Sequence, residues 1–598
     1  MDIKMYSDTL MLISSMLNMR KSTKNRIPYT PQKKAFDQDE PYLQSFERVS
    51  PESRGVQSKY IADYFRALKS DDSVVPQSVM ILRNGKMIAE GAYYPYRTDI
   101  WHVSHSLCKS VTGLAIGLLI DEKKLELDES LVSIFQKSRS AFSSAAVKSI
   151  TIRHLLTMTT GITFNEAAAI TETDWVGGFL VSRPKFEPGE SFEYNSMNSY
   201  MLSAVVKEIT GKSMSEYLDE KLFGHMGITK YYWEKCPKGI EKGGWGLYIM
   251  PEDVAKLGQL CLNGGLWHEK RLISEEWIRE ATKVQQQAYE YMGRFDYGYQ
   301  IWRARNDYAF IFNGLFGQNA VMIPKHNMII VCMAGNDEMF QKSRFFDITE
   351  KFFGPSFRPL KRRPENRREY EKLLALQAEL GVKENEYTKK HIFFKRALPQ
   401  DDRLPKAAYK LDGKYYDIAE EDRVKTSILP LFVQAMQNNF SRGIKRIGFI
   451  VKDGEFFAAI TDGDYEYKIP VGFGRARRAQ ISFNGEKYSV AVLGKFTYDE
   501  DSVPVLKISV YYLELSNVRG FKIFFTKSGI FKAECFETPG IQFIYNGVIN
   551  VLDANRNKLI DIIADKADTD YLEYKINAAL EPVLNAKLAE TANIFNDL

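Results

Sequence analysis

The sequence predicts an α+β domain followed by an antiparallel β domain. The chain has 598 residues, which is too long for one hydrophobic core and indicates two or three domains. In the first half, segments with strand character lie at both ends and amphipathic helices lie between them, a pattern typical of an α+β domain. From residue 409 to about 551, short apolar segments alternate with Asp-Gly and Asn-Gly turns, which indicates an antiparallel barrel or sandwich.

Changes in composition divide the chain into four parts. Residues 1–44 are expected to be a leader and polar linker, and residues 45–355 the α+β domain. Residues 356–408 are expected to form a charged helical connector. Residues 409–598 would be the β domain, which ends with a helix at 570–596 that a proline interrupts.

The first domain opens with two elements that the local sequence specifies. Residues 58–69 place apolar side chains at helical spacing, namely Ile61, Tyr64, Phe65 and Leu68. Residues 78–91 form two apolar strands joined at Asn84-Gly85, a dipeptide typical of tight hairpin turns. Further helices are expected at 151–161, 200–211, 216–223 and 251–262, and further strands at 297–302, 308–312, 319–323 and 328–333.

Composition and charge argue against several classes of protein. With 81 basic and 76 acidic residues, the net charge of +5 does not favour a nucleic-acid or polybasic membrane role. A basic run at 358–368 leaves nucleic-acid binding open, but a solvated linker helix is favoured because no aromatic platform accompanies it. The start of the chain lacks a convincing signal peptide, and no apolar run approaches a membrane span, so a cytoplasmic enzyme is expected. Five scattered cysteines fit a reducing compartment: Cys108, Cys236, Cys261, Cys332 and Cys535.

The stretch with the clearest chemistry is Ser106-Leu-Cys-Lys109 at the start of an apolar helix. Residues three apart on a helix touch, so the Lys109 amine can lie beside the Ser106 hydroxyl. Serine becomes a nucleophile when a neighbouring base takes its proton, and lysine can be that base if burial lowers its pKa. The apolar positions of this helix predict one buried face, formed by Val111, Leu114, Ala115, Leu118 and Leu119.

Two further segments are candidates for the same site. Tyr194 precedes Asn195 and Ser196; its hydroxyl near a lysine would have a lowered pKa and could carry protons. The segment 313–318 bears glycines that let a strand approach a ligand, although it would also suit a plain hairpin. The seven histidines lack metal-ligand spacing, and a structural role is favoured for His102 and His105.

The Ser-x-x-Lys motif at 106–109, Tyr194 and the glycine-bearing segment 313–318 follow one another along the chain. This order resembles that of the serine β-lactamase and penicillin-binding-protein superfamily, and more narrowly that of the class C β-lactamase-related hydrolases. The resemblance covers residues 45–350 and implies a transpeptidase-like antiparallel sheet with a flanking helical region. Other landmarks are Arg153-His-Leu-Leu-Thr-Met-Thr-Thr-Gly161, Glu187-Pro-Gly-Glu190, Pro251-Glu-Asp-Val-Ala, Asn263-Gly-Gly-Leu-Trp and Tyr297-Gly-Tyr-Gln-Ile-Trp.

The resemblance implies a role for each candidate. Ser106 would be the acylated nucleophile, Lys109 its base and Tyr194 the residue that assists proton transfer. The backbone N–H groups of Ser106 and Gln318 would form the oxyanion hole. Asn195, Ser196 and Gly317 would support the site.

Two positions of the sequence differ from the pattern of that family. Leu315-Phe316-Gly317 stands where β-lactamases have a cation and a hydroxyl before the glycine, and Ser196 stands where class C enzymes have asparagine. Both put β-lactam hydrolysis and D-Ala-D-Ala peptidase activity in doubt. The opening Leu411-Asp-Gly-Lys-Tyr-Tyr resembles, more weakly, the lipocalin-like barrels that follow some of these hydrolases.

The expected function is hydrolysis of an ester or amide through an acyl-enzyme, with a small-molecule or peptide-like substrate and with neither cofactor nor metal. Nucleic acid and stable membrane insertion are not expected, and a homo-oligomer stays open. The alternatives are a catalytically idle penicillin-binding-like sensor or scaffold, a genuine β-lactamase or DD-peptidase, and a lipid carrier that would need a large apolar cavity in the barrel.

Overall fold

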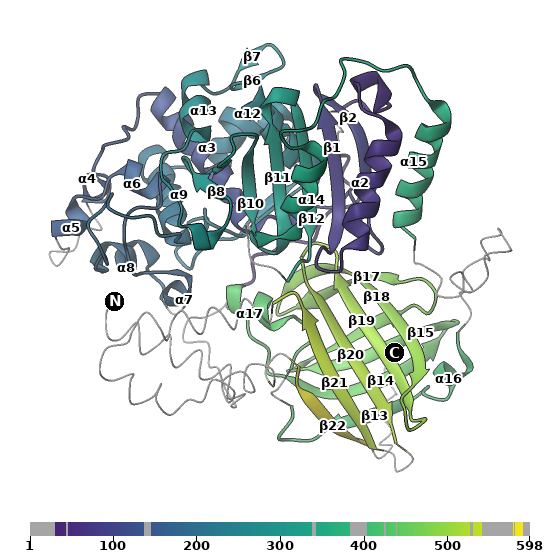
Figure 1. Cartoon of the computed structure of the whole chain (residues 1–598). Helices are drawn as coiled ribbons and strands as arrows, with labels where there is room; N and C mark the ends of the chain where they lie inside the picture. The colour runs from purple at the N-terminus through teal and green to yellow at the C-terminus, as the bar shows by residue number, and fades with distance from the viewer. Residues whose placement is uncertain are drawn as a thin grey trace. The chain divides into compact units, whose positions relative to one another are not determined.

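The computed structural model describes residues 30–42, 46–136, 145–170, 172–337, 342–382, 404–423, 426–437, 439–526, 530–540, 578 and 581–589. The chain forms two units. The first contains Gln32–Val382 together with Glu514–Ser516, and the second contains the described parts of Lys383–Leu513 and Asn517–Leu598. The predicted fold class, an α+β domain followed by an antiparallel barrel, is confirmed (Figure 1).

The first unit is built on a seven-stranded antiparallel sheet in the order β2-β1-β12-β11-β10-β9-β8. The predicted hairpin of β1 and β2 turns at Asn84 and Gly85, whose φ angles of 52° and 68° suit a type I′ turn. The strands are β1 (Pro76–Arg83), β2 (Lys86–Ala92), β8 (Phe295–Tyr297), β9 (Trp302–Ala304), β10 (Phe310–Gly314), β11 (Gln318–Ile323) and β12 (Met328–Ala334).

Helices cover both faces of this sheet. One face carries α2 (Ser58–Ser70), α14 (Arg344–Phe353) and α15 (Arg367–Leu380). The four apolar residues predicted for the inner side of α2 are all completely buried. Helix α12 (Pro251–Leu262) lies on the other face, where Gly258 approaches Met322 and Ile329.

Helix α15 belongs to the first unit, which corrects two predictions: a free connector after residue 355 and a solvated linker helix. Leu373 and Leu380 are buried in the same core as α2 and the sheet. The backbone N–H of Tyr94 donates to the Leu380 carbonyl at 2.9 Å, and Figure 1 shows α15 alongside α2. The charged residues of α15 therefore form the outer side of a packed helix, and the unit ends at Val382.

The predicted leader and linker, residues 1–44, needs a similar correction. Lys33 is 3% exposed, and the Phe36 ring lies 5.3 Å from the Trp101 ring. The Tyr42 hydroxyl donates to Asp253 at 2.8 Å. Residues 32–42 are thus part of the first unit, while 1–29 and 43–45 lie outside the described residues.

Three residues from far along the chain complete the first unit. The Glu514 carboxylate accepts from Lys33 Nζ at 2.6 Å and from Trp101 Nε1 at 3.1 Å. Ser516 Oγ accepts from Gln318 Nε2 at 2.9 Å. All five side chains are buried, so Glu514–Ser516 forms part of the core of this unit.

The helical part of the first unit surrounds α3 (Cys108–Asp121). Every residue from 108 to 119 is buried, so the prediction of a single buried face is wrong. Small residues explain the difference: a Cβ at Gly117 would lie 2.2 Å from Trp277 Nε1, which shows how closely α13 (Glu275–Thr282) approaches.

The predicted helices at 151–161, 200–211, 216–223 and 251–262 all contain helix, although the first is only five residues long and the second begins four residues earlier. The remaining helices of the unit are α4 (Leu131–Ile134), α5 (Ala145–Lys148), α6 (Ile152–Leu156), α7 (Glu166–Ala169), α8 (Trp175–Val181), α9 (Ser196–Thr210), α10 (Met214–Leu218), a π-helical turn at Asp219–Phe223 and α11 (Gly224–Met226). Short strands form two small sheets from β3 (His102–Val103), β4 (Tyr231–Trp233) and β5 (Leu247–Ile249), and from β6 (Leu266–Trp267) and β7 (Lys270–Arg271).

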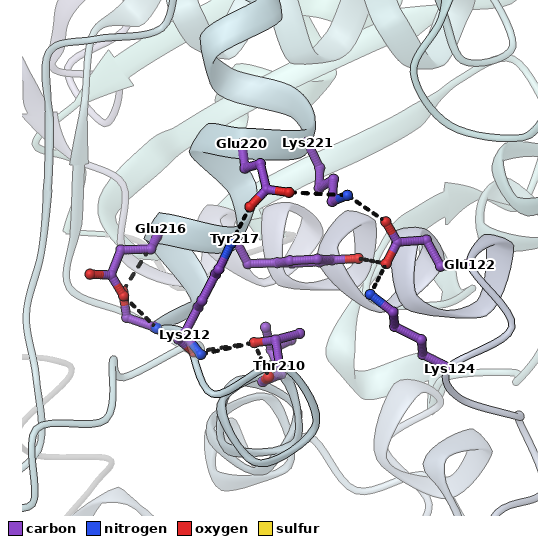
Figure 2. A network of polar contacts seen from close by, with 10 residues as sticks. Glu122, Lys124, Thr210, Lys212, Glu216, Tyr217, Glu220 and Lys221 are labelled. Atoms are coloured by element: carbon purple, nitrogen blue, oxygen red, sulfur yellow. Dashed lines mark hydrogen bonds and ion pairs between the residues drawn. The ribbon is translucent and has the colours of Figure 1, made fainter.

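A polar network fixes the C-terminal end of α3 (Figure 2). Glu122 accepts from Tyr217 Oη at 3.2 Å and pairs with Lys221 Nζ at 2.9 Å and Lys124 Nζ at 2.9 Å. Lys221 also pairs with Glu220 at 3.2 Å. These contacts join the end of α3 to α10 and the π-helical turn. The charged members are partly exposed, so each pair contributes at most about 1 kcal/mol.

The second unit is a nearly closed antiparallel barrel of ten strands. Consecutive strands of the chain pair with each other, except β16 and β17, between which the barrel stays open. The first strand, β13, also pairs with the last, β22. The strands are β13 (Lys414–Ile418), β14 (Ile444–Lys452), β15 (Glu455–Asp462), β16 (Tyr465–Val471), β17 (Arg477–Phe483), β18 (Glu486–Tyr498), β19 (Pro504–Tyr512), β20 (Val518–Phe525), β21 (Ile530–Thr538) and β22 (Val583–Leu588), with short helices α16 (Lys406–Tyr409) and α17 (Leu431–Gln437).

The predicted turns of the barrel are confirmed. Asp453-Gly454 and Asn484-Gly485 join consecutive strands with positive φ at both residues. Several buried rings pack on one another, including Tyr416 on Phe531 at 4.7 Å and Phe449 on Phe456 at 5.7 Å. Side chains therefore occupy this part of the barrel, which gives no support to the lipid-carrier alternative.

The predicted C-terminal helix is wrong where the structure describes it. Val583–Leu588 is strand β22, which pairs with β13 and β21. Leu584 and Ala586 alternate inward along it. Alanine, leucine and lysine favour helix locally, but pairing with two neighbouring strands decides the structure. The rest of 570–596 lies outside the described residues, except for residues 578, 581–582 and 589. No described helix is both long and apolar enough to cross a lipid bilayer.

Candidate active site

The candidate nucleophile lies in a tight turn between strand β3 and helix α3. Ser106 is the middle residue of a 3₁₀ turn, His105–Leu107, and is half-buried. His105 has a φ of 46°, a conformation that non-glycine residues rarely adopt. Backbone strain of this kind persists when surrounding contacts hold it, and it is concentrated at functional sites.

Lys109 occupies the first turn of α3 and contacts the Ser106 hydroxyl. Its Nζ lies 2.9 Å from Ser106 Oγ, 2.8 Å from Ser196 Oγ and 2.7 Å from the Gly244 carbonyl oxygen. The residue is 1% exposed. Burial lowers the pKa of the Lys109 ammonium from 10.5 to about 8, against the opposing effects of Cys108 and Glu166. About a tenth of Lys109 is therefore neutral at pH 7 and can accept a proton.

Tyr194 faces the same pair of residues from the loop before α9. Lys109 Nζ lies 4.9 Å from the centre of its ring, and the Ser106 side chain acts on its hydroxyl. Burial raises the pKa of Tyr194 well above 10, which outweighs the lowering effect of Ser106. The predicted lowering of this pKa is therefore wrong: the ammonium lies over the ring, and the buried hydroxyl stays protonated.

The two residues after Tyr194 have different positions. Ser196 begins α9 and accepts a hydrogen bond from Lys109, so it lies in the site. Asn195 caps α9 and donates from Nδ2 to the carbonyl oxygens of Ile162 and Phe164, both at 2.9 Å. Asn195 thus fixes the loop that carries Tyr194, but it does not contact Ser106 or Lys109.

The predicted oxyanion strand lies beside the Ser106 turn. A Cβ at Gly314, the last residue of β10, would lie 2.3 Å from the Ser104 carbonyl oxygen and 3.0 Å from the Leu107 nitrogen. The strand can approach the turn this closely only because residue 314 is glycine. Gln318 pairs with Gly314 across the hairpin and is completely buried.

The turn of this hairpin contains Phe316 and Gly317. Both have positive φ, 62° and 89°, and a Cβ at Gly317 would lie 2.6 Å from Asn336 Nδ2. Phe316 packs against His105 with ring centres 5.4 Å apart. Burial lowers the pKa of His105 to about 3 and that of His102 to about 4, so both imidazoles are neutral. His102 contacts Gln77 Oε1 at 2.6 Å and the Val103 carbonyl at 2.9 Å, which agrees with the predicted structural role.

Comparison with known proteins identifies the fold that carries this site. Residues 61–344 match the family model described as Beta-lactamase. They form a Beta-lactamase-family domain.

Relatives of the Beta-lactamase-family domain include two curated bacterial proteins. A 6-aminohexanoate-dimer hydrolase of Paenarthrobacter ureafaciens is 24% identical over 289 residues, which cover 42% of this chain and 70% of that protein. An uncharacterized protein of Alkalihalophilus pseudofirmus is 26% identical over 204 residues, 31% of this chain and 55% of that protein. The match thus spans about half the length of the latter relative.

A solved structure, a putative 6-aminohexanoate-dimer hydrolase from Bacillus anthracis, has 19% identity and a TM-score of 0.43. The match covers 57% of this chain and 92% of the chain in that structure.

Three features of the site in the Beta-lactamase-family domain could not be predicted from the sequence. The Gly244 carbonyl holds Lys109, but a backbone oxygen has no side-chain signature. The Ser196 backbone N–H donates to Glu166 Oε1 at 3.1 Å, and Glu166 belongs to a helix of only four residues. Ser516 holds Gln318 from a distant part of the sequence.

The pKa values predict how proton transfer at this site of the Beta-lactamase-family domain depends on pH. If neutral Lys109 is the base, kcat/KM rises with pH, about tenfold per unit at first, is half-maximal near pH 8 and levels off above about pH 9. His102 and His105 add no step between pH 5 and 8, and Tyr194 adds no fall below pH 10. Initial rates at low substrate concentration between pH 5 and 10 measure this profile. A profile that is flat or falls with pH would contradict Lys109 as the base.

Proposed function

We propose that the first unit is a serine hydrolase that cleaves an ester or amide through an acyl-enzyme. The observation that carries this proposal is the 2.9 Å contact between Lys109 Nζ and Ser106 Oγ, made by a buried lysine whose pKa is about 8. A lysine of this kind can take the proton of the serine hydroxyl, which makes the oxygen a nucleophile.

Each residue then has a defined task. Ser106 Oγ attacks the carbonyl carbon while Lys109 accepts the proton, and the carbonyl oxygen becomes an oxyanion. Backbone N–H groups of Ser106 and Gln318 are proposed to stabilise it. The Tyr194 hydroxyl, which burial keeps protonated, passes a proton to the leaving group and recovers one from Lys109. Water then attacks the acyl-enzyme and releases the acid.

The substrate is proposed to be a small-molecule or peptide-like ester or amide. Support comes from the hydrolase named among the relatives, together with the preserved Ser106, Lys109 and Tyr194. An idle sensor would not need a neutral lysine in contact with a serine. We also propose a reducing, cytoplasmic location, because the five cysteines are scattered; all five are free and buried.

Covalent labelling tests the proposal directly. The full chain is incubated with a biotinylated fluorophosphonate, which reacts with activated serines, and the adduct is located by peptide mass spectrometry. We expect a single adduct on Ser106 and none in a Ser106→Ala variant. Ser203→Ala removes a different buried serine hydroxyl and should label normally. An adduct elsewhere, or none at any pH up to 9, would reject the proposal.

A further inference from the structure

Glu166 is a half-buried carboxylate at the edge of the candidate site. It begins the short helix α7, and its Oε1 accepts the Ser196 backbone N–H at 3.1 Å. Ser196 Oγ in turn contacts Lys109, so one residue separates the carboxylate from the base. The charge of Glu166 acts on both Lys109 and Tyr194. Within the described part of the chain, no lysine or arginine forms an ion pair with it.

Among the described neighbours of Ser106 named below, none carries a compensating charge in the reactive state. Lys109 must be neutral to accept the proton. His105 is neutral, Tyr194 is protonated, and the turn where β-lactamases have a cation presents Phe316 instead. The N-terminus of α9 offsets about half a charge near Glu166, which leaves the region negative.

We propose that Glu166 selects substrates by charge, so that the site prefers acyl or leaving groups bearing an ammonium or guanidinium, accepts neutral ones and disfavours carboxylates. This inference rests on the proposed acyl-enzyme function and adds the charge class of its substrate. At the edge of the site, the half-buried Glu166 attracts a cation and repels an anion, and mobile ions partly screen this interaction.

Three p-nitrophenyl esters of equal length test this charge preference. Their acyl chains end in trimethylammonium, tert-butyl or carboxylate, and the first two have nearly the same shape. For the full chain at low salt, we expect kcat/KM to be about tenfold higher for trimethylammonium than for tert-butyl, and lowest for carboxylate. Glu166→Gln keeps an oxygen for the Ser196 N–H but should remove the preference. Glu172→Gln, which removes a carboxylate six residues away, should keep it.

The possible outcomes separate this inference from the proposed function. Turnover of all three esters without a charge preference, or a preference that Glu166→Gln leaves unchanged, overturns the role of Glu166 alone. Absence of turnover together with absence of a Ser106 adduct rejects the proposed function and this inference with it. Added salt provides a second measurement, because it should reduce the preference of the wild type but have little effect on Glu166→Gln.

Discussion

Lys109→Met is expected to lower kcat/KM by about 10²- to 10⁴-fold, the usual contribution of a general base. Methionine fills most of the space of the lysine but cannot accept a proton. The variant should also lose the rise of activity toward pH 8, since the group responsible for it is gone. Steady-state rates with an ester substrate, measured from pH 6 to 9, test both effects.

Two controls make the result specific to the base. Cys108→Ala changes the neighbouring buried thiol, which contacts the Gly243 carbonyl at 3.4 Å, and should retain nearly full activity. Circular dichroism and thermal unfolding of Lys109→Met should be close to the wild type, because the change replaces a buried amine with an apolar group. A folded Lys109→Met with more than about a tenth of wild-type activity would contradict the assigned role.

Glu514→Ala is expected to destabilise the first unit by about 3–5 kcal/mol. The Lys33–Glu514 ion pair is almost completely buried, with side-chain exposures of 0% and 1%. Removing the carboxylate leaves the Lys33 ammonium without its counter-charge and the Trp101 indole N–H without its acceptor. Urea unfolding, followed by tryptophan fluorescence, measures the loss.

A double variant separates charge from packing. Lys33→Met combined with Glu514→Leu removes both charges and should recover most of the lost stability, because apolar replacements of a buried ion pair are often neutral. Asp63→Ala breaks pairs with Lys59 and Arg66 on the exposed side of α2 and should cost less than about 1 kcal/mol. Equal losses for Glu514→Ala and the double variant would show that the ion pair is unimportant.

Features determined by neighbouring residues could be predicted from the sequence. The Asn84-Gly85 turn and the inner side of α2 depend on local conformation and spacing, and both are as expected. The proximity of Ser106 and Lys109 also follows from helical spacing alone. Their approach to Tyr194 was expected only because the order of motifs resembled a known family.

Features determined by distant contacts were missed or misjudged. Burial of all sides of α3 depends on Trp277 filling the space beside Gly117, which no local pattern reveals. The pKa of Tyr194 is raised by its burial, which outweighs the lowering effect of Ser106. Strand β22 is extended because it pairs with residues from the start of the barrel, against its own helical preference.

Synthesis of the chain from its N-terminus imposes an order on folding. The first unit lacks Glu514–Ser516 until most of the chain has left the ribosome. During translation, Lys33 and Trp101 are therefore without the Glu514 carboxylate that accepts their hydrogen bonds. The barrel cannot join its first strand to its last until Leu588 has been made. The first unit can therefore be completed only after residue 516 has been made, and the barrel only after residue 588, so unpaired strand edges and apolar surface stay exposed during synthesis.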